Sequence, residues 1–530
     1  TVVQIVPFGT RTEDEVLGIA ACLEEHYPHS MANAVVQAAS AKGIRHDEMH
    51  SEVQYVVAHG IASTIGGEKA VIGSQHFVFE DEGCYIPTAE TAKFDALPPE
   101  YSHLYLAIGG VLAGVICIAD PLREEAAEVL RQLRGLGINL NLAPVLDVNS
   151  NARNPVIGVR SFGDDPTRVA DFAREAVLGY QNENVCCCGK HFPGHGDTAV
   201  DSHIGLPCVD KDLPALEACE LLSFRAAIKG GIPAIMSSHI LFPRLEPDGV
   251  PATMSRRIMH DLLRGQLGFD GLILSDCMCM DAIQRHYGTP QGALAAMNAG
   301  VDLVFVSSNE TLQRETAEYL RAAAQEGRLD ETQAQASMER ILRAKERYAF
   351  TSAQPELVGL IPDREAAEWM LRRAITHVSG PLFQPDERTF FCGPEDYRAS
   401  LAGNAASAME AAPLLLRRCY GGGAAVCGKD PDEDEIARLT AQAAGYDSIL
   451  LLTCNGHLFP GQIALARALH TLSKPMIAAA LRNPYDLPLL PDIGKIAVYD
   501  YSPAALRALI AALDSGHFYG RLPVHLEESV

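Results

Sequence analysis

The sequence predicts an α/β protein in which an incomplete barrel of strands and helices is followed by an α/β layered sandwich domain. Two observations carry this prediction. From residue 139 onward, short apolar runs alternate with amphipathic helical patterns, which is typical of parallel strands joined by right-handed crossovers. These runs end in polar residues, and a (β/α)8 barrel carries its active site at the carboxyl ends of its strands. A different pattern before residue 139 indicates an α+β domain.

The predicted barrel covers residues 139–350 and contains five recognisable strands. Helical patterns at 166–181 and 214–230 lie between them, and a basic helix at 335–350 closes the segment. The expected strands are 139–148, 185–192, 232–240, 271–276 and 301–307. A closed barrel of this type needs eight strands. We therefore expect a cleft that is open on one side and an apolar interior that faces water.

The layered domain is predicted at 370–530, after a turn-rich linker at 351–369. Its apolar runs alternate with helical patterns, which again favours an α/β architecture. The expected strands are 389–394, 446–455, 474–481 and 495–501.

The first domain is predicted at 1–138 and combines helices with alternating strands at 52–65 and 69–82. The apolar run 104–119 is too short to span a membrane and has a Gly-Gly pair in its middle, so we expect a buried β-hairpin. A charged helix is expected at 120–137.

Composition excludes several classes of partner. The formal charge is −24, and no basic cluster suited to a phosphate backbone occurs, so we expect no nucleic-acid partner. The chain opens without a basic signal-peptide region, which favours a cytoplasmic protein with no membrane partner. Three of the fourteen cysteines are consecutive at 186–188 and cannot build a disulfide framework, so we expect free thiols.

The segment "CGKHFPGHGDTAVDSHIGLP" (188–207) gathers titratable residues on a loop that contains too many Gly and Pro residues for a helix interior. Hydrolysis of a glycoside requires a proton donor, and histidine titrates near neutral pH without perturbation. Asp201 stands two residues before His203 and can fix the tautomer of its ring, so the two form a hypothetical proton-transfer dyad. Metal binding by the loop histidines is an alternative, which the adjacent Lys190 disfavours, and His195 could instead brace a Gly-rich turn.

Other predicted strand ends carry carboxylates as well. Asp276 ends the strand 271–276, at a position where an aspartate can be a helix N-cap or a nucleophile. Asp147 ends the first strand, and Arg160 lies in the loop after it. Capping alone does not require so many polar groups at one edge of a sheet.

The motifs resemble glycoside hydrolase family 3, and more narrowly its bacterial β-N-acetylglucosaminidase branch. The stretches "LNLAPVLDVNSNARNPVIGVRSFGDDP", "GKHFPGHGDTAVDSH" and "PATMSRRIMHDLLRGQLGFDGLILSDCM" carry this resemblance, which runs from about residue 139 to 530. It implies Asp276 as the nucleophile and His203 as the acid/base with Asp201 as its partner. It implies no cofactor and no metal. The residues expected to bind substrate are Lys190, His191, Arg160 and Asp147.

Residues 1–138 resemble the nucleotide-binding region of heavy-metal P-type ATPases, through "CLEEHYPHSMANAVVQAA" and "VAHGIASTIGGEKAVIGSQHFVFEDE". The DKTGT and TGD motifs of these pumps are absent from the chain, which excludes pumping. Weak ATP binding is expected near His29, Gly60 and Gly73. The family 3 motif of Asp-Gln-Glu-Gly-Gly type, whose Asp binds the sugar on an early barrel strand, is absent too.

The sequence therefore predicts a retaining hydrolase that releases terminal β-linked N-acetylglucosamine from a small-molecule or oligosaccharide substrate. We expect the incomplete barrel to impair it, and a cytoplasmic location would suit recycling of cell-wall fragments. The first alternative is a nucleotide-binding fragment fused to an inactive glycosidase remnant. The second is a zinc hydrolase that uses the loop histidines.

Overall fold

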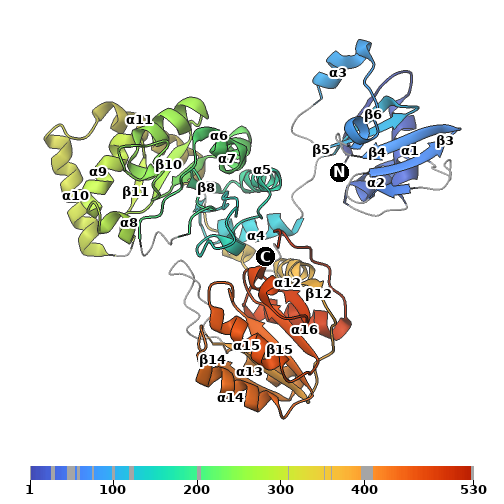
Figure 1. Cartoon of the computed structure of the whole chain (residues 1–530). Coiled ribbons are helices and arrows are strands. Elements are labelled where there is room, and N and C mark those ends of the chain that lie inside the picture. Colours follow the sequence, from blue (N-terminus) through green and yellow to red (C-terminus); the bar gives the residue numbers. More distant parts are fainter. Residues whose placement is uncertain are drawn as a thin grey trace. The chain divides into compact units, whose positions relative to one another are not determined.

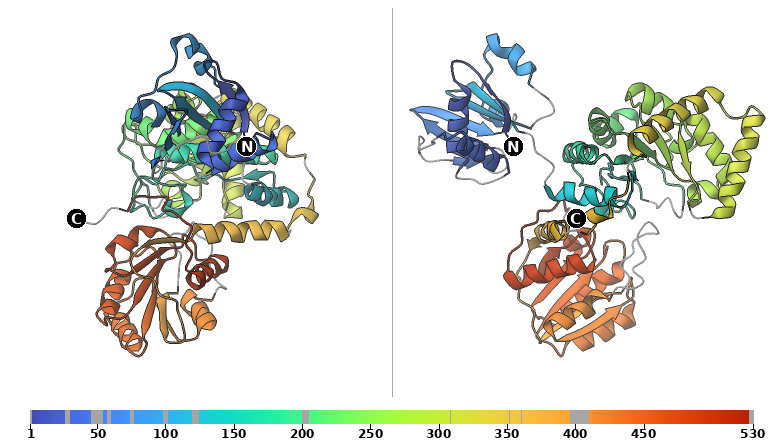
Figure 2. Two further views of the ribbon diagram at one scale, coloured as in Figure 1. Left: turned by 90° about the vertical axis from the view of Figure 1, so that its right-hand side faces the viewer. Right: turned by 180° about the vertical axis from the view of Figure 1, so that it is seen from behind.

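The computed structural model divides the chain into two compact units, Thr1–Glu124 and Glu125–Val530 (Figures 1 and 2). Each unit is described by itself. The structure describes residues 2–25, 30–44, 54–56, 60–73, 77–97, 102–118, 124–199, 205–307, 309–350, 352–359, 361–395 and 410–526. Among these residues, no helix is both long enough and apolar enough to cross a bilayer.

The first unit is an antiparallel sheet whose strands run in the order β1-β6-β5-β4-β3-β2. Two helices bury their apolar residues against one face of it. The elements are β1 (Val2–Pro7), α1 (Glu13–Glu24), α2 (Ser30–Ala41), β2 (Gln54–Val56), β3 (Gly60–Ile65), β4 (Glu68–Gly73), η1 (Phe77–Asp81), η2 (Thr88–Glu90), α3 (Thr91–Asp95), β5 (Ser102–Ile108) and β6 (Val111–Ile118). The predicted hairpin is confirmed, because β5 and β6 pair through a turn in which Gly109 and Gly110 both have positive φ.

One strand expected in this unit is shorter than the sequence predicts. The segment 69–82 continues after β4 as the π-helical turn η1. Phe77 and Val78 of this turn are buried against the face of the sheet opposite α1 and α2. Their apolar side chains imitate a strand pattern, but they cover the sheet instead of extending it.

The second unit begins with a five-stranded parallel sheet in the order β11-β10-β9-β8-β7. It confirms the five strands expected in the barrel segment, and the sheet curls as a half-barrel does. The strands are β7 (Leu140–Asn141), β8 (Cys186–Phe192), β9 (Ala234–Ser237), β10 (Leu272–Cys277) and β11 (Leu303–Phe305). Strand β7 is much shorter than the predicted 139–148, because Pro144 has no N–H to donate to a ladder.

Helices cover one face of this sheet, as a βα architecture requires. Cys187 and Ile273 point into this layer, which the helices and loops of the unit enclose. Leu130 of α4 is buried in the same cluster, so this helix packs with the half-barrel. The helix predicted at 214–230 is interrupted at Cys219. The elements are α4 (Glu124–Gly135), η3 (Gly158–Arg160), α5 (Pro166–Asn182), α6 (Leu213–Ala218), α7 (Glu220–Lys229), η4 (Ala252–Met254), η5 (Arg257–Gln266), α8 (Asp281–Gln284), α9 (Thr289–Ala299) and α10 (Glu310–Gln325).

The opposite face of the sheet corresponds to the interior of a closed barrel, and helix α11 (Glu331–Tyr348) covers it. The side chains of alternate residues on β8, β9 and β10 form this apolar face, and Ile341, Ala344 and Tyr348 pack on it. The six buried residues from the three strands are Cys186, Cys188, Ala234, Met236, Leu272 and Leu274, and none is more than 4% exposed. The expectation that this interior faces water is therefore wrong for these residues.

A second α/β layer follows, with strands in the order β12-β17-β16-β15-β13-β14. The strands β14, β13, β15, β16 and β17 are parallel, and helices cover both faces. The layered sandwich predicted for this part is thus observed, although α12 begins inside the segment expected as a linker. The elements are η6 (Pro355–Leu357), α12 (Ile361–Ala374), β12 (Thr376–Ser379), β13 (Thr389–Pro394), α13 (Ala412–Tyr420), β14 (Gly423–Cys427), α14 (Glu433–Ala443), β15 (Ser448–Thr453), α15 (Pro460–His470), β16 (Met476–Ala480), η7 (Pro484–Leu489), β17 (Gly494–Ala497) and α16 (Pro503–Ser515).

Candidate active site

Four of the expected site residues meet at the carboxyl edge of the half-barrel. Asp276 ends β10, Lys190 and His191 end β8, and Asp147 lies beside β8. Backbone hydrogen bonds from Cys188 to Ala143 (2.8 Å) and from Leu146 to Lys190 (2.7 Å) hold the segment before Asp147 along β8. Lys190 and Asp276 follow the alternation of the inward-facing residues, so both belong to the interior side of the sheet.

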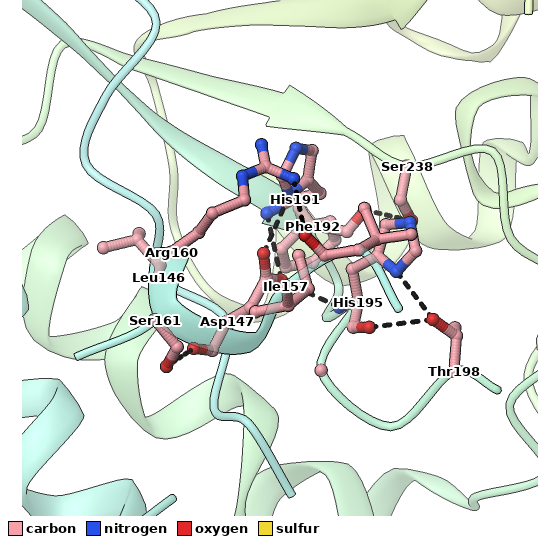
Figure 3. A network of polar contacts seen from close by, with 12 residues as sticks. Leu146, Asp147, Ile157, Arg160, Ser161, His191, Phe192, His195, Thr198 and Ser238 are labelled. Atoms are coloured by element: carbon pink, nitrogen blue, oxygen red, sulfur yellow. Dashed lines mark hydrogen bonds and ion pairs between the residues drawn. The ribbon is translucent and has the colours of Figure 1, made fainter. Parts of the chain in front are cut away.

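Asp147 is the fixed centre of this edge (Figure 3). Its Oδ1 accepts hydrogen bonds from the backbone N–H groups of His191 (3.1 Å) and His195 (2.7 Å), and its Oδ2 lies 2.7 Å from His191 Nδ1. Burial by itself would raise the pKa of Asp147, but His191, its hydrogen bonds and His195 outweigh burial and lower this pKa. The carboxylate therefore stays ionised and orients the His191 ring.

This geometry corrects the role expected for Asp147. Its side chain has no exposed surface, and both of its oxygens already have partners in the protein. The role that this geometry supports for Asp147 is to orient the His191 ring.

His195 braces the loop, which is the structural alternative considered for it. Its Nδ1 lies 2.8 Å from Thr198 Oγ1, and Asn154 donates to the carbonyl oxygens of His195 (2.7 Å) and Gly196 (3.0 Å). Burial and the nearby His191 lower the pKa of His195 to about 4. The ring is neutral at pH 7 and has a packing role in a network of buried hydrogen bonds.

Asp276 has the environment that a carboxylate nucleophile needs. Burial tends to raise its pKa, but His191, His239, the N–H of Cys277 and Lys190 outweigh burial, and the net pKa lies below the ordinary value of an aspartate. Its Oδ1 accepts from the Cys277 N–H at 2.7 Å. A carboxylate that is ionised and held at a strand end can attack an electrophilic carbon.

Lys190 supplies positive charge beside this carboxylate, and Arg160 lies near Lys190. Burial and the Arg160 guanidinium lower the pKa of Lys190, whereas Asp276 raises it. Arg160 ends the turn η3, and its Nη1 donates to the Val156 carbonyl at 3.3 Å. Figure 3 shows Arg160 among the residues of this network.

His239 is a site residue that the sequence analysis did not identify. It is buried after β9, with Nδ1 at 2.9 Å from Thr253 Oγ1 and Nε2 at 3.1 Å from the Cys277 carbonyl. Its charge bears on Asp276, as stated above. The sequence pattern could have identified His239, because this residue lies at the end of a predicted strand, as Asp147 and Asp276 do.

Asp201 and His203 lie outside the described residues, so their dyad remains a prediction. The segments on either side of them are well held. Lys211 contacts Asp197 at 3.1 Å and Glu220 at 2.5 Å, and Val209 donates to the Leu241 carbonyl at 2.9 Å. A cavity of about 1040 Å³ lies beside this loop, lined by residues that include Asp197, Arg153 and Tyr485.

The nucleotide-binding residues expected in the first unit are only partly described. His29 lies outside the described residues. Gly60 and Gly73 are paired on β3 and β4, where a Cβ at Gly60 would lie 2.3 Å from the Phe77 ring. Packing of Phe77 accounts for this glycine without a ligand. Over the described ranges, no group of three or more His, Cys, Asp or Glu residues is arranged to hold a metal ion.

The carboxyl edge of the half-barrel thus brings together a partly exposed aspartate with a lowered pKa, a lysine and buried histidines, an arrangement suited to an enzyme active site. Residues 118–344 match the glycosyl hydrolase family 3 N-terminal domain. This match begins before the predicted boundary at residue 139 and includes α4. A beta-hexosaminidase from Thiobacillus denitrificans is 34% identical over 252 residues, which cover 46% of this chain and 68% of the relative. The chain belongs to glycoside hydrolase family 3.

Two further relatives extend this comparison. Beta-hexosaminidase A from Pseudoalteromonas piscicida is 38% identical over 247 residues, and the chain spans only 41% of its length. The structure of a family 3 β-N-acetylglucosaminidase from a Paenibacillus species superposes with a TM-score of 0.68 at 35% identity, covering 77% of this chain and 80% of that one. The likeness thus extends beyond the residues of the family match.

Proposed function

We propose that this protein is a retaining β-N-acetylhexosaminidase, which releases terminal β-linked N-acetylglucosamine from an oligosaccharide or smaller glycoside. Two observations support this: the similarity to enzymes with that name, and the ionised Asp276 beside Lys190 and His191, with Arg160 near Lys190. The carboxylate in this setting is the observation that carries the proposal.

The proposed reaction has two steps. Asp276 attacks the anomeric carbon while His203, oriented by Asp201, protonates the leaving oxygen. A glycosyl ester of Asp276 forms, and the leaving group departs as an alcohol. His203 then takes a proton from water, which attacks the same carbon and frees Asp276. No cofactor takes part in these steps.

The sugar is held by the groups around Asp276. Lys190, His191 and Arg160 offer N–H donors to sugar hydroxyls, and Asp147 keeps the His191 ring in place. The cavity beside Asp197 gives room to the part of the substrate beyond the sugar. Recycling of cell-wall fragments in the cytoplasm would supply such a substrate.

Hydrolysis of 4-nitrophenyl N-acetyl-β-glucosaminide tests the proposal. Asp276→Ala should lower kcat at least about a thousandfold, since removal of a nucleophile costs several kcal/mol of barrier at about 1.4 kcal/mol per factor of ten. Asp270→Asn is the matched control, because Asp270 is exposed and precedes the same strand. Activity of Asp276→Ala within about tenfold of the wild type would refute the assignment.

Metal and nucleotide are tested separately. Turnover that persists after chelation excludes the zinc alternative. ATP binding near His29, Gly60 and Gly73 remains a prediction for the first unit, and calorimetric titration of the full chain with ATP checks it. Binding of ATP without any glycosidase activity would favour the fused-remnant alternative.

A further inference from the structure

The layered α/β part of the second unit supports the turn that carries Arg160 with two side chains, Asn483 directly and Tyr485 through Asn149. Val159, in the middle of η3, donates its backbone N–H to Asn483 Oδ1 at 2.7 Å. Asn149 Nδ2 donates to Tyr485 Oη at 2.6 Å. Asn483 and Tyr485 lie in the segment after β16, more than 300 residues along the chain from the turn.

These contacts complete the hydrogen bonding of the turn. The Gly158 N–H donates to Asn149 Oδ1 at 3.1 Å, and the Arg160 N–H donates to the Ile157 carbonyl at 2.9 Å. Each of the three N–H groups of η3 therefore has an acceptor, and the middle one depends on Asn483. Backbone donors at the start of a helical turn lack partners within it, so a side-chain acceptor fixes such a turn.

The η3 turn and Asn483 are also closely packed against each other. Gly158 has φ +44°, and a Cβ there would lie 2.3 Å from Asn483 Oδ1. Asn483 and Asn149 are both buried, and Asn483 is itself held by its N–H, which donates to Asn455 Oδ1 at 3.3 Å. The turn cannot move toward the layered domain, and it cannot leave without exposing a donor that has lost its partner.

Arg160 needs such a support because its surroundings repel it. Its guanidinium lies near Lys190, and this proximity helps to lower the pKa of Lys190. Two cations of like charge in a partly buried site move apart unless their backbones are held. A small displacement of a binding group can cost one to two orders of magnitude in rate.

We propose that Asn483 and Tyr485 are positioning residues, through which the layered domain holds the Arg160 turn in register with Asp276. This inference rests on the proposed function, since it assumes that Arg160 binds the sugar. It assigns the layered domain a part in the reaction although none of the expected catalytic residues comes from it.

Kinetics of four variants test the proposal. We expect Asn483→Ala to lower kcat/KM by about tenfold to a hundredfold, mainly through KM. Asn483→Asp keeps an acceptor oxygen and should stay within about threefold of the wild type. Tyr485→Phe should have a smaller effect in the same direction as Asn483→Ala. Asp492→Asn, at an exposed position of the same domain, is the matched control and should change nothing.

A double-mutant cycle separates positioning from general stability. In an Arg160→Ala background, Asn483→Ala should change kcat/KM by less than about twofold, because the group that it positions is already gone. If the losses of kcat/KM in the two single variants added up in the double variant, the proposal would be overturned. An Asn483→Ala protein that is as active as the wild type would overturn it as well.

Amide hydrogen exchange provides a readout that does not depend on turnover. Exchange at residues 157–160 should become faster in Asn483→Ala, and stay unchanged in Asn483→Asp and Asp492→Asn. An unchanged rate in Asn483→Ala overturns the proposal whether or not the protein hydrolyses a glycoside. If the wild type shows no hydrolysis, the proposed function fails on its own, and the exchange result still decides whether Asn483 holds the turn.

Discussion

At the scale of single residues, the site depends on one buried carboxylate whose two oxygens both have partners within the protein. Asp147 accepts from two backbone N–H groups and faces the ring nitrogen of His191. These contacts fix both the path of the loop and the direction of the ring. His191 in turn lowers the pKa of Asp276. Asp147 therefore influences the ionisation of the proposed nucleophile indirectly, because it holds the His191 ring in place.

We predict that Asp147→Asn lowers kcat/KM roughly hundredfold. The Asn amide places a donor where His191 and His195 already donate, which turns the ring of His191 away from its position. Asp171→Asn on the exposed side of α5 is the control. In a His191→Gln background the effect of Asp147→Asn on kcat/KM should largely vanish. If the losses of kcat/KM in Asp147→Asn and His191→Gln added up fully in the double variant, Asp147 would not act through His191.

The titration of His195 makes the free energy of unfolding depend on pH. Its pKa is about 4 in the folded state against 6.5 for an unperturbed histidine, so the unfolded chain binds more protons between these values. Its contribution, up to about 3 kcal/mol, is complete above pH 6.5 and is lost as the pH falls toward 4. His457, with a pKa of about 4, acts in the same direction, whereas Asp486, with a pKa raised to about 6 by burial, acts oppositely between pH 4 and 6.

We therefore predict that the wild type loses more stability than His195→Gln between pH 7.5 and pH 4.5. The difference in the free energy of unfolding between the two proteins should shrink by about 2 kcal/mol or more over this range. Urea unfolding at several pH values measures it, and Asp486 and His457 cancel in the comparison because both proteins contain them. Parallel pH profiles would contradict the proposed titration of His195.

At the scale of elements, the order of strands and helices was predictable and their partners were not. Strand β13 occupies the same residues as its predicted run, and β8 and β10 end within one residue of their predicted ends, because local alternation and turn residues set these elements. Local pattern could not reveal that η1 covers a sheet. It also could not place Asp147 beside a ring 44 residues away, or Asn483 on a turn 324 residues away.

Helix α11 gives the clearest example of an unpredicted partner. Its basic composition indicated a helix, but nothing in its pattern showed that it would cover the inward face of the half-barrel. An ion pair between Arg340 and Asp302 (3.1 Å) and a hydrogen bond from Ser337 Oγ to Asp302 Oδ1 (2.7 Å) hold it there. Tyr348, at its end, packs against the strands.

We predict that Tyr348→Ala destabilises the protein by about 3 kcal/mol or more, because removal of a buried aromatic ring leaves a cavity over the sheet. Phe350→Ala is the matched control: this ring is two residues further on and 83% exposed, so its loss should cost no more than about 0.5 kcal/mol. The shift of the urea-unfolding midpoint measures both. Equal shifts for the two variants would mean that α11 does not cover the sheet in solution.

At the scale of the whole molecule, the second unit combines a half-barrel with a layered α/β domain. The parallel sheet of the described residues has β7 and β11 at its edges, whereas a closed barrel has no edge. The groups that gather around Asp276 all come from one side of the sheet or from its loops. The layered domain compensates in part, since it fixes the Arg160 turn from outside the sheet.

The last prediction concerns the efficiency of this arrangement. Binding energy from contacts all around a sugar is what orients it for attack, and a half-barrel provides fewer of these contacts. We predict measurable hydrolysis of 4-nitrophenyl N-acetyl-β-glucosaminide with kcat/KM below about 10⁴ M⁻¹s⁻¹, the lower end for typical enzymes. The deficit should lie mostly in KM, because Asp276 keeps the surroundings that ionise it. The strand edges should also promote association, so light scattering should detect larger species as the protein concentration rises. A kcat/KM above about 10⁶ M⁻¹s⁻¹ from a monomer would mean that five strands suffice.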